Sequence, residues 1–441
     1  MRQRTDRFSD RADLTAFLGA FCFFLSAVEY MLPKPLPFMR LGIANLPILL
    51  AVDILPFRWY LALAVVKVIG MSLISGTLFS YIALFSMAGT MAAALTMWGL
   101  RRAGGRFISQ IGVSIIGAMV SNASQIFIAR YLVFRETAWL IAPLFLAMGL
   151  ATGAGLGIFA ERFARISKWY AMATSLPPPG REAAPEKRKG RNPLKFSLFP
   201  RHGTEGRHER KEKVAVMRAA RKKKAETFFA PGSLAFAGMI AMLAFLFAEG
   251  LGAKAIMLCL FAFAAWTMGK RFSLVTTLSV SLGIIAANLL VPSGLILAEL
   301  WGFRITKGAL IEGIGKALTF EGLMYLSKAT IMPGLKLPGR LGRIVATAFT
   351  YYDKVIEYKG KIRASSLALD SDDMMLLVWE SGEGRGGDSG SEASVTAVAA
   401  VGGSAVPSSC AVRGGADTRR RGLTILALAV TATWALTIFI R

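Results

Sequence analysis

Apolar runs long enough to cross a lipid bilayer make up most of this sequence, and a strongly basic, proline-rich segment from Pro177 to Thr227 divides them into two blocks. A bilayer core is ~30 Å thick and a helix rises ~1.5 Å per residue, so about 20 apolar residues span it. Hydrophobic residues are 54% of the chain and charged residues 18%, which excludes an ordinary soluble domain. The sequence predicts an all-α, polytopic integral membrane protein with two helical bundles joined by a basic cytoplasmic linker.

The first block contains six apolar runs that we predict to be membrane spans. Their ranges are 14–32, 41–57, 59–78, 79–100, 108–129 and 138–160. With the N-terminus in the cytoplasm, the cluster Arg101, Arg102 and Arg106 and the basic linker lie inside, whereas the outer loop near Gly76 carries no charge. This distribution obeys the positive-inside rule. We therefore predict a multi-pass protein of the cell (inner) membrane with a cytoplasmic N-terminus.

The second block is less uniform than the first. We predict spans at 234–250, 254–269 and 272–292, and a last one within 423–441. The stretch 305–330 is apolar but contains five charged residues, so it is either a polar-lined span or an interfacial helix. Residues 340–359 have apolar positions at helical spacing, and this amphipathic helix fits either the inner membrane surface or a groove on a partner. The predicted domain boundaries are 1–165, 166–230 (basic linker), 231–380, 381–422 (flexible, Gly/Ser-rich) and 423–441.

The basic segment between the two blocks contains sixteen Lys and Arg residues and six Glu residues. Such a segment cannot enter hydrocarbon, and its charge could attract anionic lipid or RNA. Only Phe196 and Phe199 interleave with the charges, whereas a single-strand binding platform needs more stacking residues. We interpret the segment as a solvated linker that orients the protein, and we expect no specific nucleic acid partner.

No signature of a soluble enzyme is present. A phosphate-cradling loop needs Gly-x-x-x-x-Gly-Lys followed by Ser or Thr, but Ala317 follows Gly315-Lys316 and Leu310 occupies the position of the first glycine. Metal-assisted prenyl transfer needs paired Asp-rich motifs, and the chain has a single acidic cluster at 370–373. We predict no catalytic residue, no metal and no cofactor in this chain, so that ATP, if used, is bound by partner subunits.

Polar residues within or beside the apolar runs of the first block are the candidates for a binding site. An ionisable group at the bilayer centre costs roughly 2.5–3.5 kcal/mol on insertion scales, so each should have a partner, a cavity or a role. The candidates are Glu29, Arg40, Asp53, Lys67, Asn122, Gln125 and Arg130. Asn122 and Gln125 share a helical face and, with Arg130, could line a pocket that opens outward. Alternatively, the two amides only tie helices together and Glu29 only pairs with Lys67.

The segment between the first two predicted spans, Lys34 to Pro47, interrupts regular helix. Prolines at 33, 35 and 37 break the helix, and the step from Asn45 to Pro47 loosens the start of the next one. Non-helical backbone at membrane depth is tolerated where it is buried or lines a cavity. The segment therefore fits a substrate entrance or lid, or else a plain hairpin connection.

Three stretches in this block stand out in order: VEYMLPKPLPFMRLGIANLP (28–47), KVIGMSLISGTLFS (67–80) and GAMVSNASQ (117–125). They closely resemble the Gx transporter family, whose members are often labelled heptaprenyl diphosphate synthase component I. The resemblance covers residues 14–162. It implies a six-helix substrate-binding component similar to that of energy-coupling factor transporters, which captures a small molecule from the outside.

The second block is similar, more weakly, to the transmembrane coupling component of the same transporters. The likeness involves FRITKGAL (303–310), LSKAT (326–330) and the amphipathic helix that follows. It implies cytoplasmic helices that insert into paired ATPase subunits. Arg363 is the coupling candidate, although it lacks the usual neighbours of the family's motif.

The sequence therefore predicts a fused substrate-binding and coupling subunit of a membrane uptake system for a small molecule, embedded in the lipid bilayer and partnered by ATPase subunits. The predicted substrate-binding residues are Glu29, Arg40, Asn45, Lys67, Asn122 and Gln125. Arg40 and Lys67 are favoured for an anionic group. The alternative is a membrane component of heptaprenyl diphosphate synthase that assists a soluble prenyltransferase chain, and a third possibility is a structural scaffold.

Overall fold

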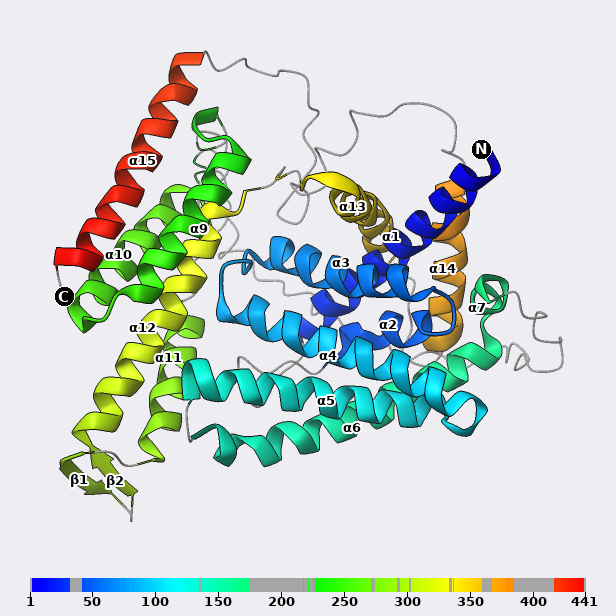
Figure 1. Ribbon diagram of the computed structural model, residues 1–441, viewed down its shortest axis with the longest axis horizontal. Coiled ribbons are helices and arrows are strands. Elements are labelled where there is room, and N and C mark those ends of the chain that lie inside the picture. The colour runs from blue at the N-terminus through cyan, green and yellow to red at the C-terminus, as the bar shows by residue number, and fades with distance from the viewer. Residues whose placement is uncertain are drawn as a thin grey trace, which may run out of the picture.

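The computed structural model is almost entirely helical (Figure 1). The residues that it describes are 2–31, 42–134, 137–174, 217, 221, 225, 227–270, 274–291, 294–300, 303–332, 335, 337–358, 367–383 and 416–439. Arg40, Arg363 and most of the basic linker lie outside these residues, and the predictions made for them stay predictions.

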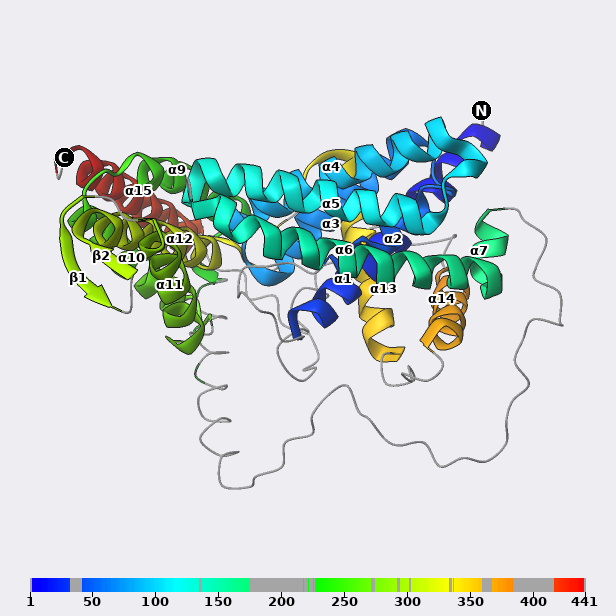
Figure 2. The same cartoon turned by 90° about the horizontal axis from the view of Figure 1, so that it is seen from below.

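The first part of the chain forms a layered helical body that we call the N-terminal module. Its elements are α1 (Arg2–Met31), the 3₁₀ turn η1 (Ile43–Asn45), α2 (Leu46–Ala51), α3 (Phe57–Ser75), α4 (Tyr81–Gly104), the turn η2 (Gly105–Phe107), α5 (Gln110–Ala129), the π-turn η3 (Arg130–Phe134), α6 (Thr137–Ile166) and α7 (Lys168–Ala173). Helices α3 to α6 lie side by side and alternate in direction (Figures 1 and 2).

The second part of the chain begins with a bundle that we call the C-terminal bundle. It contains α9 (Pro231–Phe247), α10 (Leu251–Thr267), α11 (Leu274–Leu289), the strands β1 (Ile296–Leu300) and β2 (Phe303–Thr306), α12 (Lys307–Thr330) and, from the end of the chain, α15 (Ala416–Phe439). The intervening helices α13 (Gly339–Tyr358) and α14 (Leu367–Glu383) pack on the N-terminal module. The β1–β2 hairpin, which the sequence analysis did not anticipate, is antiparallel.

Among the described residues, six helical segments are long and apolar enough to cross a membrane. They are Arg11–Glu29, Phe57–Ser75, Tyr81–Gly104, Gln110–Leu132, Ala138–Ile166 and Arg421–Ile438. Five of them match predicted spans of the first block and the sixth matches the predicted last span. The all-α, multi-pass membrane fold is therefore confirmed. Shorter apolar helices cover the predicted spans at 234–250, 254–269 and 272–292.

The predicted continuous span at 41–57 is wrong. The chain there forms η1, a six-residue α2 and a turn, and α2 rises only about 9 Å. Pro47 lies in the first turn of α2, where a missing N–H is harmless, and Pro56 stands just before α3 in an extended conformation. Gly42 has a φ of 83°, which glycine adopts without strain. The prolines and this glycine therefore divide a run that hydropathy alone reads as one helix.

The stretch 305–330, for which the sequence left two possibilities, contains the single long helix α12. At 1.5 Å per residue its 24 residues reach about 36 Å, longer than a bilayer core. It packs against α9, α10 and α11, so its charged residues sit among helices. Glu312 and Lys316, four positions apart on α12, form an ion pair, with Lys316 Nζ 3.1 Å from Glu312 Oε1.

The amphipathic helix expected at 340–359 is confirmed as α13, but its apolar face is covered from within the chain. It lies along α1 and α3 (Figure 1). Ala348 and Val355 are fully buried, and the ring of Phe23 from α1 packs 5.3 Å from that of Phe349. This face therefore needs neither a lipid surface nor a partner groove, the two placements that the periodicity had suggested.

Helix α14 is joined to the N-terminal module by Asp372. One carboxylate oxygen of Asp372 accepts hydrogen bonds from Ser167 Oγ and from the backbone N–H of Trp169, and the other accepts from the N–H of Lys168 at 3.0 Å. These donors begin α7, where N–H groups have no partner inside the helix. Asp372 belongs to the acidic cluster that the sequence analysis noted, and here it acts as a cap between distant segments.

Candidate functional site

A cavity of about 670 Å³ lies inside the molecule, within the 300–1,000 Å³ typical of ligand pockets. Its walls come from α1, the η1–α2 segment, α3, α4, α5 and α6, and also from the second half of the chain, through residues of α11, α12 and α13. Aliphatic side chains such as Leu49 and Ile74 alternate with hydroxyl, amide and charged groups along it. The cavity is thus built jointly by the two halves of the sequence.

Lys67 projects from the middle of α3 into this cavity and is only 4% exposed. Its ammonium group donates hydrogen bonds to Asn45 Oδ1 and, at 3.2 Å, to Thr90 Oγ1. A buried ammonium needs such polar contacts because desolvation of a charge is costly. Lys67 therefore joins α3 to α4 and to the irregular segment before α2, and it supplies positive charge to the cavity wall.

Glu29 lies near the end of α1 and is 5% exposed. Its Oε2 accepts a hydrogen bond from the backbone N–H of Ala44 at 3.4 Å. Ala44 belongs to η1, where the backbone is not α-helical and lines the cavity together with Gly42 and Asn45. The structure thus confirms that irregular backbone at this point borders a cavity, as expected for a segment of this kind.

Asn122 and Gln125 both line the cavity from α5. Asn122 Nδ2 donates to the carbonyl oxygen of Phe145 at 2.6 Å and so ties α5 to α6, whereas Gln125 Nε2 donates to Ser121 Oγ at 3.2 Å on its own helix. Asn122 therefore ties two helices together, as the alternative interpretation of the sequence held, and it also borders the cavity. Arg130 does not line the cavity, and its guanidinium stacks 5.2 Å above the ring of Trp139.

Five of the six predicted binding residues, Glu29, Asn45, Lys67, Asn122 and Gln125, thus lie on the wall of one cavity, although four separate elements carry them. The sixth, Arg40, lies outside the described residues, as does the coupling candidate Arg363. Their roles in binding and coupling stay predictions.

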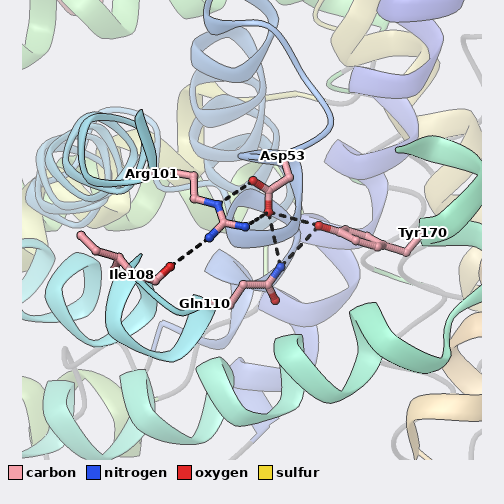
Figure 3. Close-up of polar contacts among 5 residues, drawn as sticks. All are labelled: Asp53, Arg101, Ile108, Gln110 and Tyr170. Carbon is pink, nitrogen blue, oxygen red and sulfur yellow. Dashed lines mark hydrogen bonds and ion pairs between the residues drawn. The ribbon is translucent and has the colours of Figure 1, made fainter. Parts of the chain in front are cut away.

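Asp53, a further candidate, lies away from this cavity in a polar network (Figure 3). Arg101 donates from Nε to Asp53 Oδ1 at 2.8 Å and from Nη2 to Oδ2 at 3.1 Å, and its Nη1 donates to the carbonyl of Ile108. The Tyr170 hydroxyl donates to Asp53 Oδ2 at 3.3 Å, and Gln110 Nε2 donates to the same oxygen at 3.4 Å. Burial and the nearby carboxylate raise the pKa of Tyr170, which keeps the hydroxyl a donor. The network joins α4, α5 and α7 to the turn after α2.

Helix α7, which contributes Tyr170 to this network, also packs against α1. The ring of Phe17 in α1 lies 5.3 Å from that of Trp169 in α7. The middle of α1 and α7, which follows α6 toward the linker, are therefore neighbours. The side of the membrane on which this contact lies stays a prediction.

Two cationic residues of the cavity wall were not among the predicted binding residues. Lys270 follows α10 and Lys328 lies near the end of α12, and both line the cavity. Together with Lys67 and Glu29 they are the Lys and Glu side chains of the described cavity wall, so positive charge prevails there. Lys328 was noted only as one charge of the stretch 305–330, because sequence gives no sign that this stretch meets the first block. Such a wall suits a molecule that carries an anionic group.

Two family models match the chain. Residues 18–163 match the model described as heptaprenyl diphosphate synthase component I, and residues 234–332 match a domain of unknown function (DUF8519). The resemblance of the second block to a transporter coupling component is not confirmed by these matches. No curated protein and no solved structure matches the chain. The match over residues 18–163, which make up most of the N-terminal module, confirms the resemblance of the first block to the heptaprenyl diphosphate synthase component I family, also called the Gx transporter family.

Proposed function

We propose that this chain is the substrate-binding and coupling component of a membrane uptake system of the energy-coupling-factor kind, and that it takes up a small anionic molecule. The observation that carries the proposal is the cavity of about 670 Å³ between the two halves of the chain, which Lys67 and four other polar residues predicted from the sequence line. A lysine that is 4% exposed in such a cavity costs free energy unless it has a role, and binding an anion is the role that its charge supports.

In this proposal, ATP is hydrolysed by separate ATPase subunits that bind the cytoplasmic side of the chain. The sequence resemblance of residues 303–310 and 326–330 to a coupling component supports this part. Arg363 is the proposed ATPase contact. We expect Arg363→Glu to abolish co-purification of ATPase subunits without loss of bound substrate, and Lys361→Glu, two residues away, to serve as the matched control. Equal co-purification with Arg363→Glu would overturn the assignment.

The description of the matching family favours a second candidate function. The chain would then be the membrane component of a heptaprenyl diphosphate synthase and would bind a separate catalytic prenyltransferase chain. In that case the cavity would hold a prenyl substrate or product rather than a transported solute. The two candidates differ in the protein partner that they require.

Mass spectrometry of the gently purified protein separates the two candidates. ATPase subunits together with a retained small anion would support the uptake system, and a soluble prenyltransferase with no ATPase would support the synthase component. The retained molecule should be lost from Lys67→Gln but kept by Lys316→Gln, because Lys316 is a cation of α12 that does not line the cavity. If Lys67→Gln retains the molecule as well as the wild type does, the cavity is not the binding site in either candidate function.

A further inference from the structure

We propose that α11 and α12 form a cap over one end of the cavity, and that Lys328, together with Lys270 beside the end of α12, supplies a second anion-binding point in addition to Lys67. The inference rests on the proposed function and extends it, because it makes the substrate a molecule that both halves of the chain hold. It also names a partner segment for the N-terminal module that the family match at 18–163 does not cover.

The cap is joined to the rim of the N-terminal module by specific contacts. Beside the cavity, the backbone N–H of Phe79, in the turn between α3 and α4, donates to Ser327 Oγ of α12 at 3.0 Å. The rings of Tyr81 and Phe320 lie 6.4 Å apart. A shared apolar cluster continues this contact and combines residues of α4 to α6 with residues of α11 and α12: Phe85, Ile126, Ala138, Ala142, Phe145, Val280, Ile284, Ala287, Ala317 and Phe320.

Lys328 is placed where the cap, the rim and the cavity meet. Its Cγ would lie 3.7 Å from a Cβ added at Gly76, so its aliphatic stem runs along the α3–α4 turn. Its ammonium group lies 5.1 Å from the centre of the Tyr325 ring, and the Tyr325 hydroxyl shares a 2.6 Å hydrogen bond with Thr277 of α11. Lys328 therefore packs on Tyr325, the residue that joins α12 to α11, and still lines the cavity.

Lys270 reaches the same wall from the turn that follows α10. Its Nζ donates to the carbonyl oxygen of Ile331 at 2.8 Å, which fixes it beside the end of α12. Within the described cap, Glu321 is the carboxylate that acts electrostatically on Lys328. It is 1% exposed and does not line the cavity, so the cap presents cations to the interior.

The chemistry of the wall near the cap defines the class of ligand. Met71, Ile74 and Met324 supply apolar surface, and Thr77 and Thr277 add hydroxyl groups to the same wall. An oxyanion joined to a small apolar body fits this mixture. Because such a ligand would contact Lys67 on one side and Lys328 on the other, its binding should hold the cap against the rim.

The test measures the unfolding temperature of the full-length protein in detergent with sodium phosphate or sodium decanoate, each compared with sodium chloride at equal ionic strength. We expect one of the two anions to raise the unfolding temperature of the wild type in a saturable way. Phosphate alone would indicate a water-soluble oxyanion, and decanoate alone would indicate that the apolar body is needed. The apparent affinity should fall at least tenfold in Lys328→Gln and in Lys67→Gln, and stay within twofold in the control Lys316→Gln.

The outcomes separate this inference from the proposed function. If Lys67→Gln weakens binding and Lys328→Gln does not, the cap has no part in recognition and the inference is overturned while the proposed function stands. If neither anion stabilises the wild type, or if Lys67→Gln binds as the wild type does, both fail. Equal weakening by Lys316→Gln would also overturn the inference, because it would indicate a nonspecific effect of charge.

A cysteine pair tests the cap contact without any change at the lysines. Phe79→Cys and Ser327→Cys are introduced together after Cys22, Cys259 and Cys410 have been replaced by serine. We expect the pair to cross-link, and to do so at least threefold faster with the stabilising anion than with chloride. If the pair does not cross-link, or if its cross-linking rate is the same with the anion as with chloride, the cap does not close on the substrate.

Discussion

At the scale of single residues, Gly70 decides how closely α1 and α3 can pack. A Cβ added to Gly70 would lie 2.0 Å from Cζ of Phe23, a separation that real atoms do not adopt. The Phe23 ring cannot easily move away, because it packs against Phe349 and against Tyr352, whose ring centre is 6.0 Å away. One missing methyl group thus permits contact among three helices.

Gly70→Ala should therefore destabilise the protein by about 1–3 kcal/mol, the usual cost of overpacking a core. The matched control is Gly99→Ala in α4, because nothing lies within 4 Å of a Cβ at that position. Thermal unfolding in detergent measures both variants. A Gly70→Ala protein that unfolds at the temperature of the control would contradict the close packing of α1 on α3.

Loss of the Asp53 network should destabilise the protein less than Gly70→Ala does. Asp53→Asn keeps the shape of the side chain but removes the ion pair with Arg101, whose two side chains are 23% and 30% exposed. Partly exposed pairs contribute little, so we expect a loss of about 1 kcal/mol, which includes the weakened hydrogen bond from Tyr170. Arg165→Gln, which breaks the exposed pair with Glu161 in α6, is the control and should change stability by less than about 0.5 kcal/mol. Equal unfolding temperatures for the two variants would show that the network adds nothing.

The candidate site could be predicted in part from single residues. Glu29, Lys67 and Asn122 were found because polar groups in apolar runs are costly and therefore conspicuous. Lys270 and Lys328 were missed as site residues because a lysine near the end of a helix is ordinary. Only the tertiary packing of α12 on the α3–α4 turn brings Lys328 to the cavity.

At the scale of elements, the contact between α14 and α7 depends on one carboxylate. Asp372 is 4% exposed and accepts hydrogen bonds from three donors at the start of α7. We expect Asp372→Ala to cost about 1–3 kcal/mol, because it leaves buried donors without an acceptor. The neighbouring Asp373 is exposed, so Asp373→Ala is the matched control.

Hydrogen exchange checks this prediction locally. The amides of Lys168 and Trp169 should exchange faster in Asp372→Ala than in Asp373→Ala, while amides in the middle of α4 keep their protection. Unchanged exchange at both amides in Asp372→Ala would show that α7 is held by its apolar contacts alone.

Helix α13 offers a sharper test, because its two faces differ. Ala348 is 0% exposed and faces α1, where a Cβ added to Gly19 would lie 3.5 Å from its own Cβ. Ala348→Glu would bury a charge without a partner, so we expect a loss of several kcal/mol and rapid tryptic cleavage within α13. Arg343→Glu places the same side chain on the exposed face and should be tolerated. If Ala348→Glu is as stable as the wild type, Ala348 does not lie buried against α1.

The sequence predicted which helices form better than it predicted where a helix is interrupted or which helices pack together. Hydropathy and helical periodicity located five spans of the first block, the last span and α13. The run 41–57 was taken as one helix because its composition is apolar, yet backbone geometry at Gly42, Pro47 and Pro56 outweighs composition there. The partner of the apolar face of α13 could not be predicted, because periodicity defines a face and not what covers it.

At the scale of the whole molecule, the chain passes between its two parts more than once. After the C-terminal bundle, α13 and α14 pack on the N-terminal module, and α15 then packs on α9 and α10 (Figure 1). The core of the N-terminal module therefore combines residues before 175 with residues after 338. The basic linker suggested two bundles, but it gave no sign that the second half completes the first.

We therefore expect a fragment of residues 1–174 to accumulate poorly in membranes when expressed alone, because it lacks the helices that cover Phe17 and Phe23. Co-expression with residues 217–441 should restore it, and the two fragments should purify together. The control is the second fragment with Ala348→Glu, which should fail to restore it. A fragment 1–174 that is stable and monodisperse alone would contradict the shared core.

The contact between Gly19 and Ala348 also has a consequence during protein synthesis. The two residues meet in the folded protein but are separated by roughly 330 positions along the chain. At about 5–20 residues per second, a ribosome needs on the order of 15–65 s to reach the second after the first. Over that interval the side of α1 that α13 later covers is without this partner helix. The N-terminal module, although synthesised first, therefore completes its folding only after nearly the whole chain has been translated.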